Sequence, residues 1–428
     1  MEEISLEPQK VERAFLVGIQ EPGMSREDAE DHLAELASLT DTMGVGVAGQ
    51  QIARVARPTP QLYLGAGKAD EIKALADAHE ADVIIFDTDL SPSQQRNWEE
   101  LTGVAVIDRQ EVILDIFAGR AQTREARLQV GLARMEYSLP RLRRAWTHLE
   151  RQRGGAGMRG GPGELQLEVD RRVVMERITR FKRQLAEVRK QRAVQRQARG
   201  ARPVPTAAIV GYTNAGKSSL LKRLTGADVF IEDKLFATLD TTTRRILLPN
   251  NQPLLLTDTV GFIRKLPHGL VEAFKATLEE AALADFLVHV LDISNPKIEE
   301  HYRVTNEVLE ELGAGDRKTI IVLNKADREH DPYLLAQFRR HNPLTFKTSV
   351  ATGEGIESLL QAFADHFILP MRRLHLRIPH NRFDLVNLVH REGTVHDQRH
   401  EADGVWLDAD IPLRHLKDLA PFEPAPPD

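Results

Sequence analysis

The segment TAAIVGYTNAGKSSLLKRLTG, Thr206 to Gly226, decides the fold of this chain. It opens with a short apolar run typical of a buried strand and ends with an amphipathic pattern typical of a helix. Between them, Gly211 to Ser218 has the spacing GxxxxGK(S/T) in the strand–loop–helix context of a phosphate-binding loop. Glycines let backbone N–H groups wrap a phosphate chain, and the helix start adds partial positive charge. The segment therefore predicts an α/β domain that binds a nucleotide.

This loop also indicates the metal site. We expect Lys217 to reach the β- and γ-phosphates and the Ser218 hydroxyl to bind Mg²⁺. A second apolar strand, PLLLTD, ends in the sequence DTVG, Asp258 to Gly261. A carboxylate at the end of a buried strand beside the phosphate loop can hold Mg²⁺ through water.

Two later strand ends indicate the base. Asp327, in NKAD, can accept both N–H donors on the edge of guanine, a pattern that adenine does not offer. Asn324 would tie the site together, and the aliphatic stem of Lys325 can cover the base. The sequence FKTSVATG places further backbone N–H groups where they could meet the guanine O6. The nucleotide is therefore expected to be GTP, with its base held by Asn324, Lys325, Ala326, Asp327, Ser349, Val350 and Ala351.

The segment KLFATLDTTTRR, residues 234–245, lies between the phosphate loop and DTVG. A nucleotide switch needs a hydroxyl here that reaches Mg²⁺ and the γ-phosphate only when the triphosphate is bound. Four residues qualify, and position alone does not choose among Thr238, Thr241, Thr242 and Thr243.

Composition limits the class of protein. The chain has 428 residues, enough for two to four domains, and its 42% hydrophobic content allows sizeable cores. There are no cysteines, which excludes disulfides and suits a reducing compartment. We find no apolar run long enough to span a bilayer and no N-terminal secretion signal. We therefore expect a cytoplasmic protein.

Charge is distributed unevenly. The chain has a net charge of −6, but residues 120–200 contain 21 Lys and Arg against 8 Asp and Glu, a net of +13. Arginine predominates, and its guanidinium forms paired hydrogen bonds to phosphates better than lysine does. The block indicates a polyanionic partner, with a solvated helical surface as the alternative.

The apolar patterns predict a multidomain α/β protein. Strands are expected over 14–19, 44–55, 62–67, 83–87 and 104–108, alternating with helices, as in a parallel sheet. Val174, Ile178, Phe181, Leu185 and Val188 have coiled-coil spacing, and Pro140 should kink or split the first helix of an antiparallel pair. We therefore expect an N-terminal α/β domain (1–122), an antiparallel helical hairpin with a glycine-rich tip (123–200), a linker (201–205), a GTPase domain (206–371), a small ferredoxin-like α+β domain (372–420) and a tail (421–428).

GYTNAGKS, FATLD, DTVGFI and the long segment RRAWTHLERQRGGAGMRGGPGELQLEVDRR resemble the motifs of the HflX family of ribosome-associated GTPases. The resemblance covers nearly the whole chain and is weakest after about residue 372. It implies that Thr238 is the switch threonine, so that Ser218 and Thr238 hold Mg²⁺ and Lys217, Thr238 and Gly261 assist hydrolysis. The remaining implied contacts to GTP or GDP are Gly211, Tyr212, Thr213, Asn214, Ala215, Gly216, Phe236, Ala237, Leu239, Asp240, Asp258, Thr259 and Val260.

The resemblance also implies a role. Such factors insert the helical hairpin, with its loop Gly154 to Gly163, into the large ribosomal subunit and split stalled or idle ribosomes under stress. Hydrolysis then releases the factor, which is expected to act as a monomer. Two alternatives remain open: a signalling GTPase with a protein effector, associated peripherally with a membrane, and an RNA-remodelling NTPase with a second nucleotide site in the N-terminal domain.

Phe262 occupies the position after DTVG, where many GTPases have a glutamine that orients the attacking water. A phenyl ring cannot hydrogen-bond to water, so a partner is expected to stimulate slow intrinsic hydrolysis. Arg264, Lys265 and His268 lie nearby in sequence and are alternative candidates. Asn214 resembles the asparagine that holds K⁺ in some related GTPases, which makes K⁺ a second candidate cation.

Overall fold

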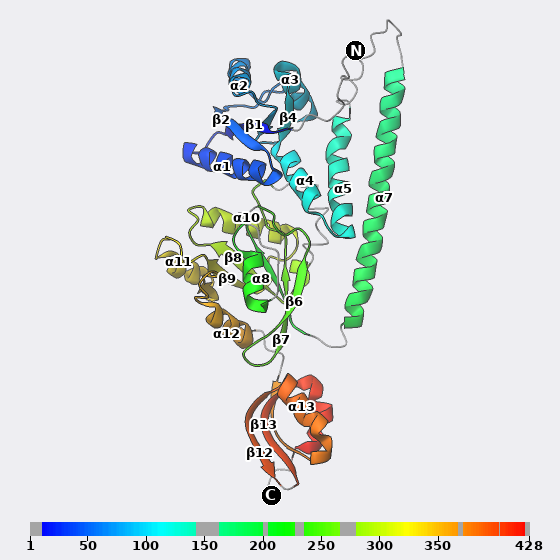
Figure 1. The fold of residues 1–428 in the computed structure, drawn as a ribbon, viewed down its shortest axis with the longest axis vertical. Helices are drawn as coiled ribbons and strands as arrows, with labels where there is room; N and C mark the ends of the chain where they lie inside the picture. The colour runs from blue at the N-terminus through cyan, green and yellow to red at the C-terminus, as the bar shows by residue number, and fades with distance from the viewer. Residues whose placement is uncertain are drawn as a thin grey trace. The chain divides into compact units, whose positions relative to one another are not determined.

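The computed structural model describes residues 11–142, 162–199, 204–226, 235–265, 280–366, 371–401 and 403–423 (Figure 1). Most of the glycine-rich loop expected at Gly154 to Gly163 lies outside these residues, as do His268, most of the linker and the end of the tail. The chain divides into two compact units. One contains Met1–Gln195, Glu232–Asp240 and Lys265–Ala276, and the other contains Arg196–Ile231, Thr241–Arg264 and Thr277–Asp428.

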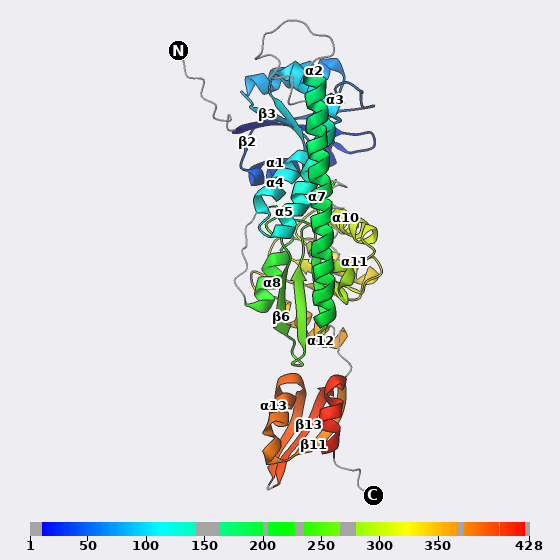
Figure 2. The same cartoon turned by 90° about the vertical axis from the view of Figure 1, so that its right-hand side faces the viewer.

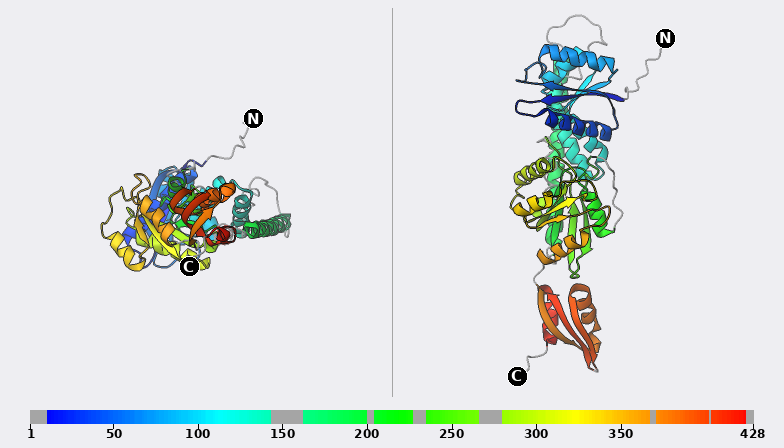
Figure 3. Two further views of the ribbon diagram at one scale, coloured as in Figure 1. Left: turned by 90° about the horizontal axis from the view of Figure 1, so that it is seen from below. Right: turned by 90° about the vertical axis from the view of Figure 1, so that its left-hand side faces the viewer.

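The N-terminal domain contains a parallel sheet of four strands in the order β2-β1-β3-β4. Helices cover both faces of this sheet (Figure 3, right). Phe15, Phe86 and Trp98 are fully buried in its core. The predicted α/β domain is therefore confirmed. Its elements are β1 (Arg13–Gln20), α1 (Arg26–Met43), β2 (Gly46–Arg54), α2 (Ala66–Ala78), β3 (Val83–Phe86), α3 (Pro92–Thr102), β4 (Ala105–Asp108) and α4 (Arg109–Arg120).

The strand predicted over 62–67 is wrong, because this segment forms a tight turn before α2. Tyr63 adopts a left-handed conformation with φ of 66°. The Thr59 hydroxyl donates to the Leu64 carbonyl at 2.8 Å, and the Trp98 indole N–H donates to the Leu62 carbonyl at 2.7 Å. Leu64 is buried, and Leu62 and Tyr63 are partly buried, in a turn that the Thr59 hydroxyl stabilises.

The nucleotide domain contains a sheet of six strands in the order β10-β9-β8-β5-β7-β6, in which only β6 is antiparallel to its neighbour. Parallel strands bring their carboxyl ends to one edge, so the loops that follow β5, β7, β9 and β10 meet there. Its elements are β5 (Thr206–Gly211), α8 (Lys217–Thr225), β6 (Thr242–Leu247), β7 (Pro253–Asp258), β8 (Phe286–Asp292), α10 (Ile298–Glu311), β9 (Thr319–Asn324), α11 (Leu334–His341), β10 (Thr345–Lys347) and α12 (Ile356–His366).

The C-terminal domain is the predicted small α+β unit. Its antiparallel sheet has the order β11-β13-β12, and in the described residues it lacks the last strand of a complete ferredoxin-like unit. Alternate residues of β11, such as Leu374 and Leu376, are buried against helices on one face. The elements are β11 (Met371–Ile378), α13 (Phe383–Glu392), β12 (Thr394–Glu401), β13 (Gly404–Pro412) and α14 (Leu416–Leu419). Across the part of the chain that is described, no helix has the length and apolar character of a membrane span.

The helical hairpin, hereafter the arm, consists of α5 (Arg124–Ser138) and α7 (Pro162–Arg199), which lie side by side (Figures 1 and 2). Leu128 and Leu132 of α5 pack against Ile178 and Leu185 of α7, which confirms the predicted seam. Instead of the kink or split expected at Pro140, α5 ends at Ser138 and a short 3₁₀ turn, Leu139–Arg141, follows.

Asp108 connects the C-terminal end of α5 to the N-terminal sheet. One oxygen of its buried carboxylate accepts hydrogen bonds from the Glu111 backbone N–H and the Tyr137 hydroxyl, both at 3.0 Å. The other accepts from the Leu90 backbone N–H at 3.2 Å and lies 3.4 Å from the Arg141 guanidinium. Burial raises the pKa of Asp108 to about 6, against the opposing effect of these donors. The C-terminal end of α5 is therefore fixed to β4.

Gly131 provides a test of the arm seam, because a Cβ at this position would lie 3.2 Å from the Phe181 ring. We expect Gly131→Val to force α7 away from α5 and to lower the free energy of unfolding by about 1–3 kcal/mol. Gly119→Val is the matched control, since nothing lies within 4 Å of a Cβ there, and it should change stability by only ~0.5 kcal/mol. Urea titration of the helical circular dichroism signal measures both. Equal effects would contradict the close packing at Gly131.

Candidate nucleotide site

The loop between β5 and α8 has a shape that only glycine permits at two positions. Gly211 has φ of 144°, and a Cβ there would lie 2.2 Å from the Val290 carbonyl oxygen. Gly216 has φ of 95°, and a Cβ there would lie 2.3 Å from the Asn324 side-chain nitrogen. Left-handed backbone of this kind turns successive N–H groups inward, which is the geometry that binds anions. The loop is therefore shaped to hold phosphate groups.

Lys217, the first residue of α8, is buried at the end of this loop. Its ammonium donates to the Tyr212 carbonyl at 2.7 Å. Burial lowers the pKa of Lys217 to about 8, and the nearby Asp258 carboxylate opposes the shift. A desolvated cation in this position gains free energy when a phosphate anion binds beside it.

Ser218 and Asp258 form the oxygen pair predicted to bind Mg²⁺. The Ser218 hydroxyl donates to the Asp258 carboxylate at 2.6 Å, at the end of buried strand β7. Hydroxyl and carboxylate oxygens beside a phosphate site are the ligands that Mg²⁺ prefers. The donor set therefore fits this ion.

The first residues after β7 pack against the phosphate loop. A Cβ at Gly261 would lie 2.9 Å from the Thr213 methyl carbon and 3.0 Å from the Lys217 amine. The Thr259 hydroxyl donates to the Ile209 carbonyl at 2.7 Å. Thr259, Val260 and Phe262 are all buried. DTVG thus brings its glycine against the lysine expected to bind the terminal phosphates.

The predicted base-binding residues meet at the ends of β9 and β10. The Asn324 amide donates to the Ala215 carbonyl at 3.0 Å and accepts from the Val350 backbone N–H at 3.2 Å, so it connects the phosphate loop to the Ser349–Ala351 segment. The Ser349 hydroxyl donates to Asp327 at 2.5 Å, which holds the pKa of this exposed carboxyl below its ordinary value. An ionised Asp327 is the acceptor that a guanine edge requires.

One contributor to this region was not anticipated from the sequence. The Asp292 carboxylate, at the end of β8, forms an ion pair with the Lys325 ammonium at 2.7 Å. Lys325 also has a left-handed backbone, with φ of 65°. A carboxylate that directly follows a buried strand is the same signal that identified Asp258, so Asp292 could have been found in the same way.

The FATLD segment belongs to the N-terminal compact unit. The Phe236 ring packs edge-on against Phe117 of α4, with centroids 4.5 Å apart. The Asp240 carboxylate accepts from the backbone N–H groups of Gln122 and Thr123 at 3.0 and 3.1 Å, and from the Thr123 hydroxyl. Asp240 thus stabilises the start of α5.

The four candidate switch threonines differ in their surroundings. Thr242 and Thr243 lie in β6, where they pair with Asp258 and Thr257 of β7. Thr238 and Thr241 precede this strand, and Thr238 is half-buried. Because Thr242 and Thr243 are paired within the sheet, Thr238 and Thr241 are the candidates that lie outside a strand. The assignment of Thr238 to Mg²⁺ stays a prediction.

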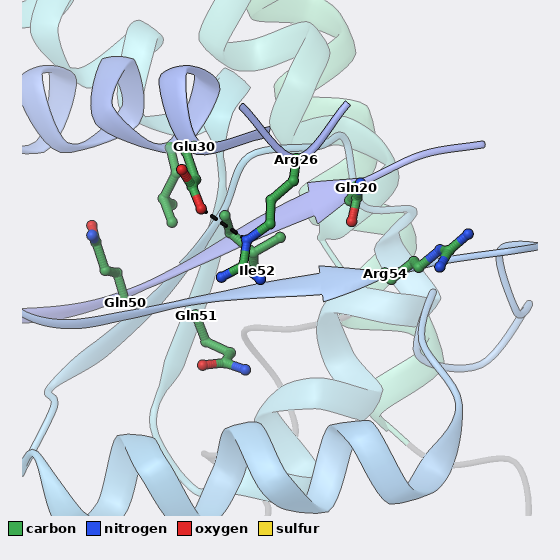
Figure 4. A pocket seen from close by; sticks show the side chains of 8 residues that line it. Gln20, Arg26, Glu30, Gln50, Gln51, Ile52 and Arg54 are labelled. Carbon is green, nitrogen blue, oxygen red and sulfur yellow. Dashed lines mark hydrogen bonds and ion pairs between the residues drawn. The ribbon is translucent and has the colours of Figure 1, made fainter. Parts of the chain in front are cut away.

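A cavity of about 460 Å³ opens in the N-terminal domain at edge strand β2 (Figure 4). Its lining is mostly polar, and Arg26 is paired with Glu30 across a distance of 2.9 Å. None of its lining residues belongs to the predicted nucleotide motifs. The cavity is lined by Gln20, Arg26, Glu30, Leu33, Gln50, Gln51, Ile52 and Arg54.

Lys217 makes phosphate affinity depend on pH. A bound phosphate favours the ammonium form and raises the pKa of Lys217. The affinity for phosphate is therefore highest below about pH 8, where the lysine is protonated, and falls above it. We expect GDP affinity to decrease by up to about tenfold between pH ~7.5 and ~9, as one titrating proton allows. Fluorescence titration with labelled GDP measures this change. Guanosine, which has no phosphate, is the control ligand and should show no such loss; an equal loss for guanosine, or a flat GDP profile, would contradict the assignment.

Comparison with known proteins identifies the family. Residues 30–118, 120–199 and 206–325 match the family models described as GTP-binding GTPase N-terminal, GTP-binding GTPase middle region and 50S ribosome-binding GTPase. GTPase HflX of Akkermansia muciniphila is 49% identical over 99% of both chains, and GTPase HflX of Escherichia coli is 43% identical over 93% of both. A solved GTP-binding protein from Sulfolobus solfataricus, in complex with GDP, is 25% identical, with a TM-score of 0.44 and coverage of 83% of this chain and 98% of that one. The sequence matches, which span almost the full length, place this chain in the HflX family of GTPases.

Proposed function

We propose that this chain is a ribosome-associated GTPase that binds the large ribosomal subunit and splits or rescues stalled or idle ribosomes under stress. The observation that carries the proposal is the meeting of four elements at one sheet edge. They are the glycine-shaped phosphate loop, the Ser218–Asp258 oxygen pair, Gly261 beside Lys217, and the Asn324–Asp327 segment. Together they match the phosphates, the metal and the guanine edge of one nucleotide.

Each group has a defined task in the proposed site. Backbone N–H groups of the loop and the Lys217 ammonium bind the phosphates, and Asp327 selects guanine over adenine. Ser218, with Asp258 and Thr238, would hold Mg²⁺, which when bound offsets negative charge on the phosphate oxygens. Gly261 provides a backbone N–H beside the lysine. Asn214, with φ of 58° in the loop, remains the candidate ligand for K⁺.

Dependence on a partner follows from Phe262. Its side chain is only 1% exposed, and its backbone is paired with the phosphate loop. It therefore cannot swing out to orient water, and it has no polar group to do so. A surface that supplies or positions this function would accelerate hydrolysis, which suits a factor that must stay GTP-bound until it reaches its target.

The arm supports a ribosomal target. The positive block of residues 120–200 largely coincides with α5 and α7, and exposed arginines on α7 include Arg171, Arg172, Arg177, Arg180 and Arg183. Multiple exposed guanidinium groups on a long helix favour the phosphate backbone of RNA. The family description of a 50S ribosome-binding GTPase agrees with this partner. Such a role also suits a cytoplasmic monomer.

Guanine selection can be tested at Asp327. Asp327→Asn replaces one acceptor oxygen with a donor that faces a guanine donor, so GTP affinity should fall about a hundredfold, given ~1.5–3 kcal/mol per charged hydrogen bond. Xanthosine nucleotides, which have an acceptor at that edge, should gain affinity. Competition binding measures both. Asp316→Asn, at an exposed position, is the control and should leave both affinities unchanged. An Asp327→Asn variant that keeps guanine preference would refute the role of Asp327.

The ribosomal proposal predicts that purified large subunits raise GTP turnover. In a variant with Arg177, Arg180 and Arg183 all changed to Gln, the concentration of subunits needed for stimulation should rise about tenfold or more, while basal turnover stays the same. The matched Lys variant keeps the charges and should retain most of the stimulation. Phosphate release with and without large subunits, at two salt concentrations, provides the measurement. Stimulation that is absent in the unmodified protein would exclude the proposed target.

A further inference from the structure

Tyr212, the second residue of the phosphate loop, makes contacts that no motif explains. Its side chain is 5% exposed. The ring stacks on the His301 ring of α10, with centroids 3.7 Å apart and planes 5° from parallel. The hydroxyl oxygen accepts a hydrogen bond from the Arg264 backbone N–H at 2.8 Å. Its carbonyl is the acceptor for Lys217. Tyr212 thus contacts both the phosphate loop and the segment that follows DTVG.

The Tyr212 hydroxyl belongs to a three-point clamp between these two segments. The Thr213 N–H donates to the Phe262 carbonyl at 2.8 Å, and the Phe262 N–H donates to the Gly211 carbonyl at 3.1 Å. The third point is the bond from the Arg264 N–H to Tyr212. Two of the bonds join backbone groups and do not depend on side-chain identity. The third depends on one phenol oxygen. Tyr212 is therefore the residue at which a side-chain substitution can remove one of the three hydrogen bonds.

The clamp determines where Gly261 lies. Gly261 directly precedes Phe262, and a Cβ on it would lie 3.0 Å from the Lys217 amine. The space between the two segments is therefore small, and a shift of a few tenths of an ångström at residues 262–264 would change the distance from the Gly261 N–H to a terminal phosphate. A diphosphate lacks the terminal phosphate that this N–H would reach, so its binding is not expected to depend on Gly261.

The clamp also lies where the chain passes from one compact unit to the other. The unit that contains the nucleotide domain includes the segment Thr241–Arg264, and Lys265 belongs to the N-terminal unit. Lys265 has a left-handed backbone, with φ of 53°, and its ammonium lies 3.6 Å from the Glu21 carboxylate. Tyr212 therefore holds the last residue of the nucleotide-domain segment, and the chain changes direction immediately after it.

We propose that Tyr212 is a positioning residue for the terminal phosphate of GTP. By accepting from the Arg264 N–H, it keeps Gly261 at the distance from Lys217 that a γ-phosphate requires. The His301 ring fixes the Tyr212 ring at the angle that makes this hydrogen bond possible. This inference rests on the proposed assignment of Lys217 and Gly261 to the phosphates.

The test is Tyr212→Phe, which keeps the ring stack and removes only the hydroxyl. In Mg²⁺ buffer, we expect affinity for a non-hydrolysable GTP analogue to fall about fivefold to tenfold, while GDP affinity changes by less than about twofold, as expected when one buried hydrogen bond is lost on the γ-phosphate side only. If Tyr212 had a purely structural role, the substitution would lower the affinities for both nucleotides equally. Tyr302→Phe is the matched control, because it removes a tyrosine hydroxyl at the neighbouring position on α10, where the Tyr302 ring contacts His289 and Phe338. It should leave the ratio of the two affinities unchanged.

A second variant tests the same proposal if Tyr212→Phe does not fold. His301→Leu removes the stacking partner and keeps the hydroxyl, so it should lower the same affinity ratio by a smaller factor. Equal loss for both nucleotides, or no loss for either, in the Tyr212 variant would overturn the positioning role. If the unmodified protein failed to bind either guanine nucleotide, the assignment of the site itself would fall, which is a separate outcome from failure of the Tyr212 inference.

Discussion

The phosphate loop cannot keep its shape by local interactions alone. Gly211 and Gly216 adopt left-handed backbone conformations. Because a glycine backbone is unusually flexible in the unfolded chain, fixing it in one conformation costs entropy. Contacts from distant strands provide the constraint. Asn324, at the end of β9, donates to the Ala215 carbonyl, and the Val290 carbonyl on β8 leaves no room for a side chain at Gly211. The sheet order, which places β8 and β9 next to β5, is therefore what makes an anion site possible.

A buried cation is the second constraint. Lys217 is desolvated, its pKa is lowered, and Asp258 lies close enough to oppose that shift. Asp258 in turn accepts from Ser218. A site with a partly compensated positive charge at its centre binds a phosphate more strongly than a solvated lysine would, because the charge interacts through a medium of low polarity. The same desolvation makes the empty site costly, which favours the nucleotide-bound protein.

Much of this architecture could be predicted from the sequence, because the signals are local. Apolar runs followed by GYTNAGKS, DTVG and NKAD identified β5, β7 and β9 and the residues after them. The seam of the arm followed from helical periodicity. Other features depend on contacts between distant residues. The turn at Tyr63 depends on the Thr59 hydroxyl, and the hydrogen bond from Arg264 to Tyr212 joins residues 52 positions apart. No local pattern identifies such pairs, so the sequence suggested a strand at the first and gave no indication of the second.

The residues around Phe262 and those of the FATLD segment belong to different parts of the chain. The phenyl ring is buried and its backbone pairs with the phosphate loop, so this segment packs against the site and its side chain has no polar group that could bind water. The FATLD segment and Lys265 belong to the other compact unit, together with the start of the arm. Asp240 accepts from Gln122 and Thr123, which directly precede α5, so the FATLD segment is hydrogen-bonded to the residues that lead into the arm. The phosphate loop, Asp258, Gly261 and the Asn324–Asp327 segment therefore lie in one compact unit, whereas the FATLD segment lies in the unit that contains most of the arm.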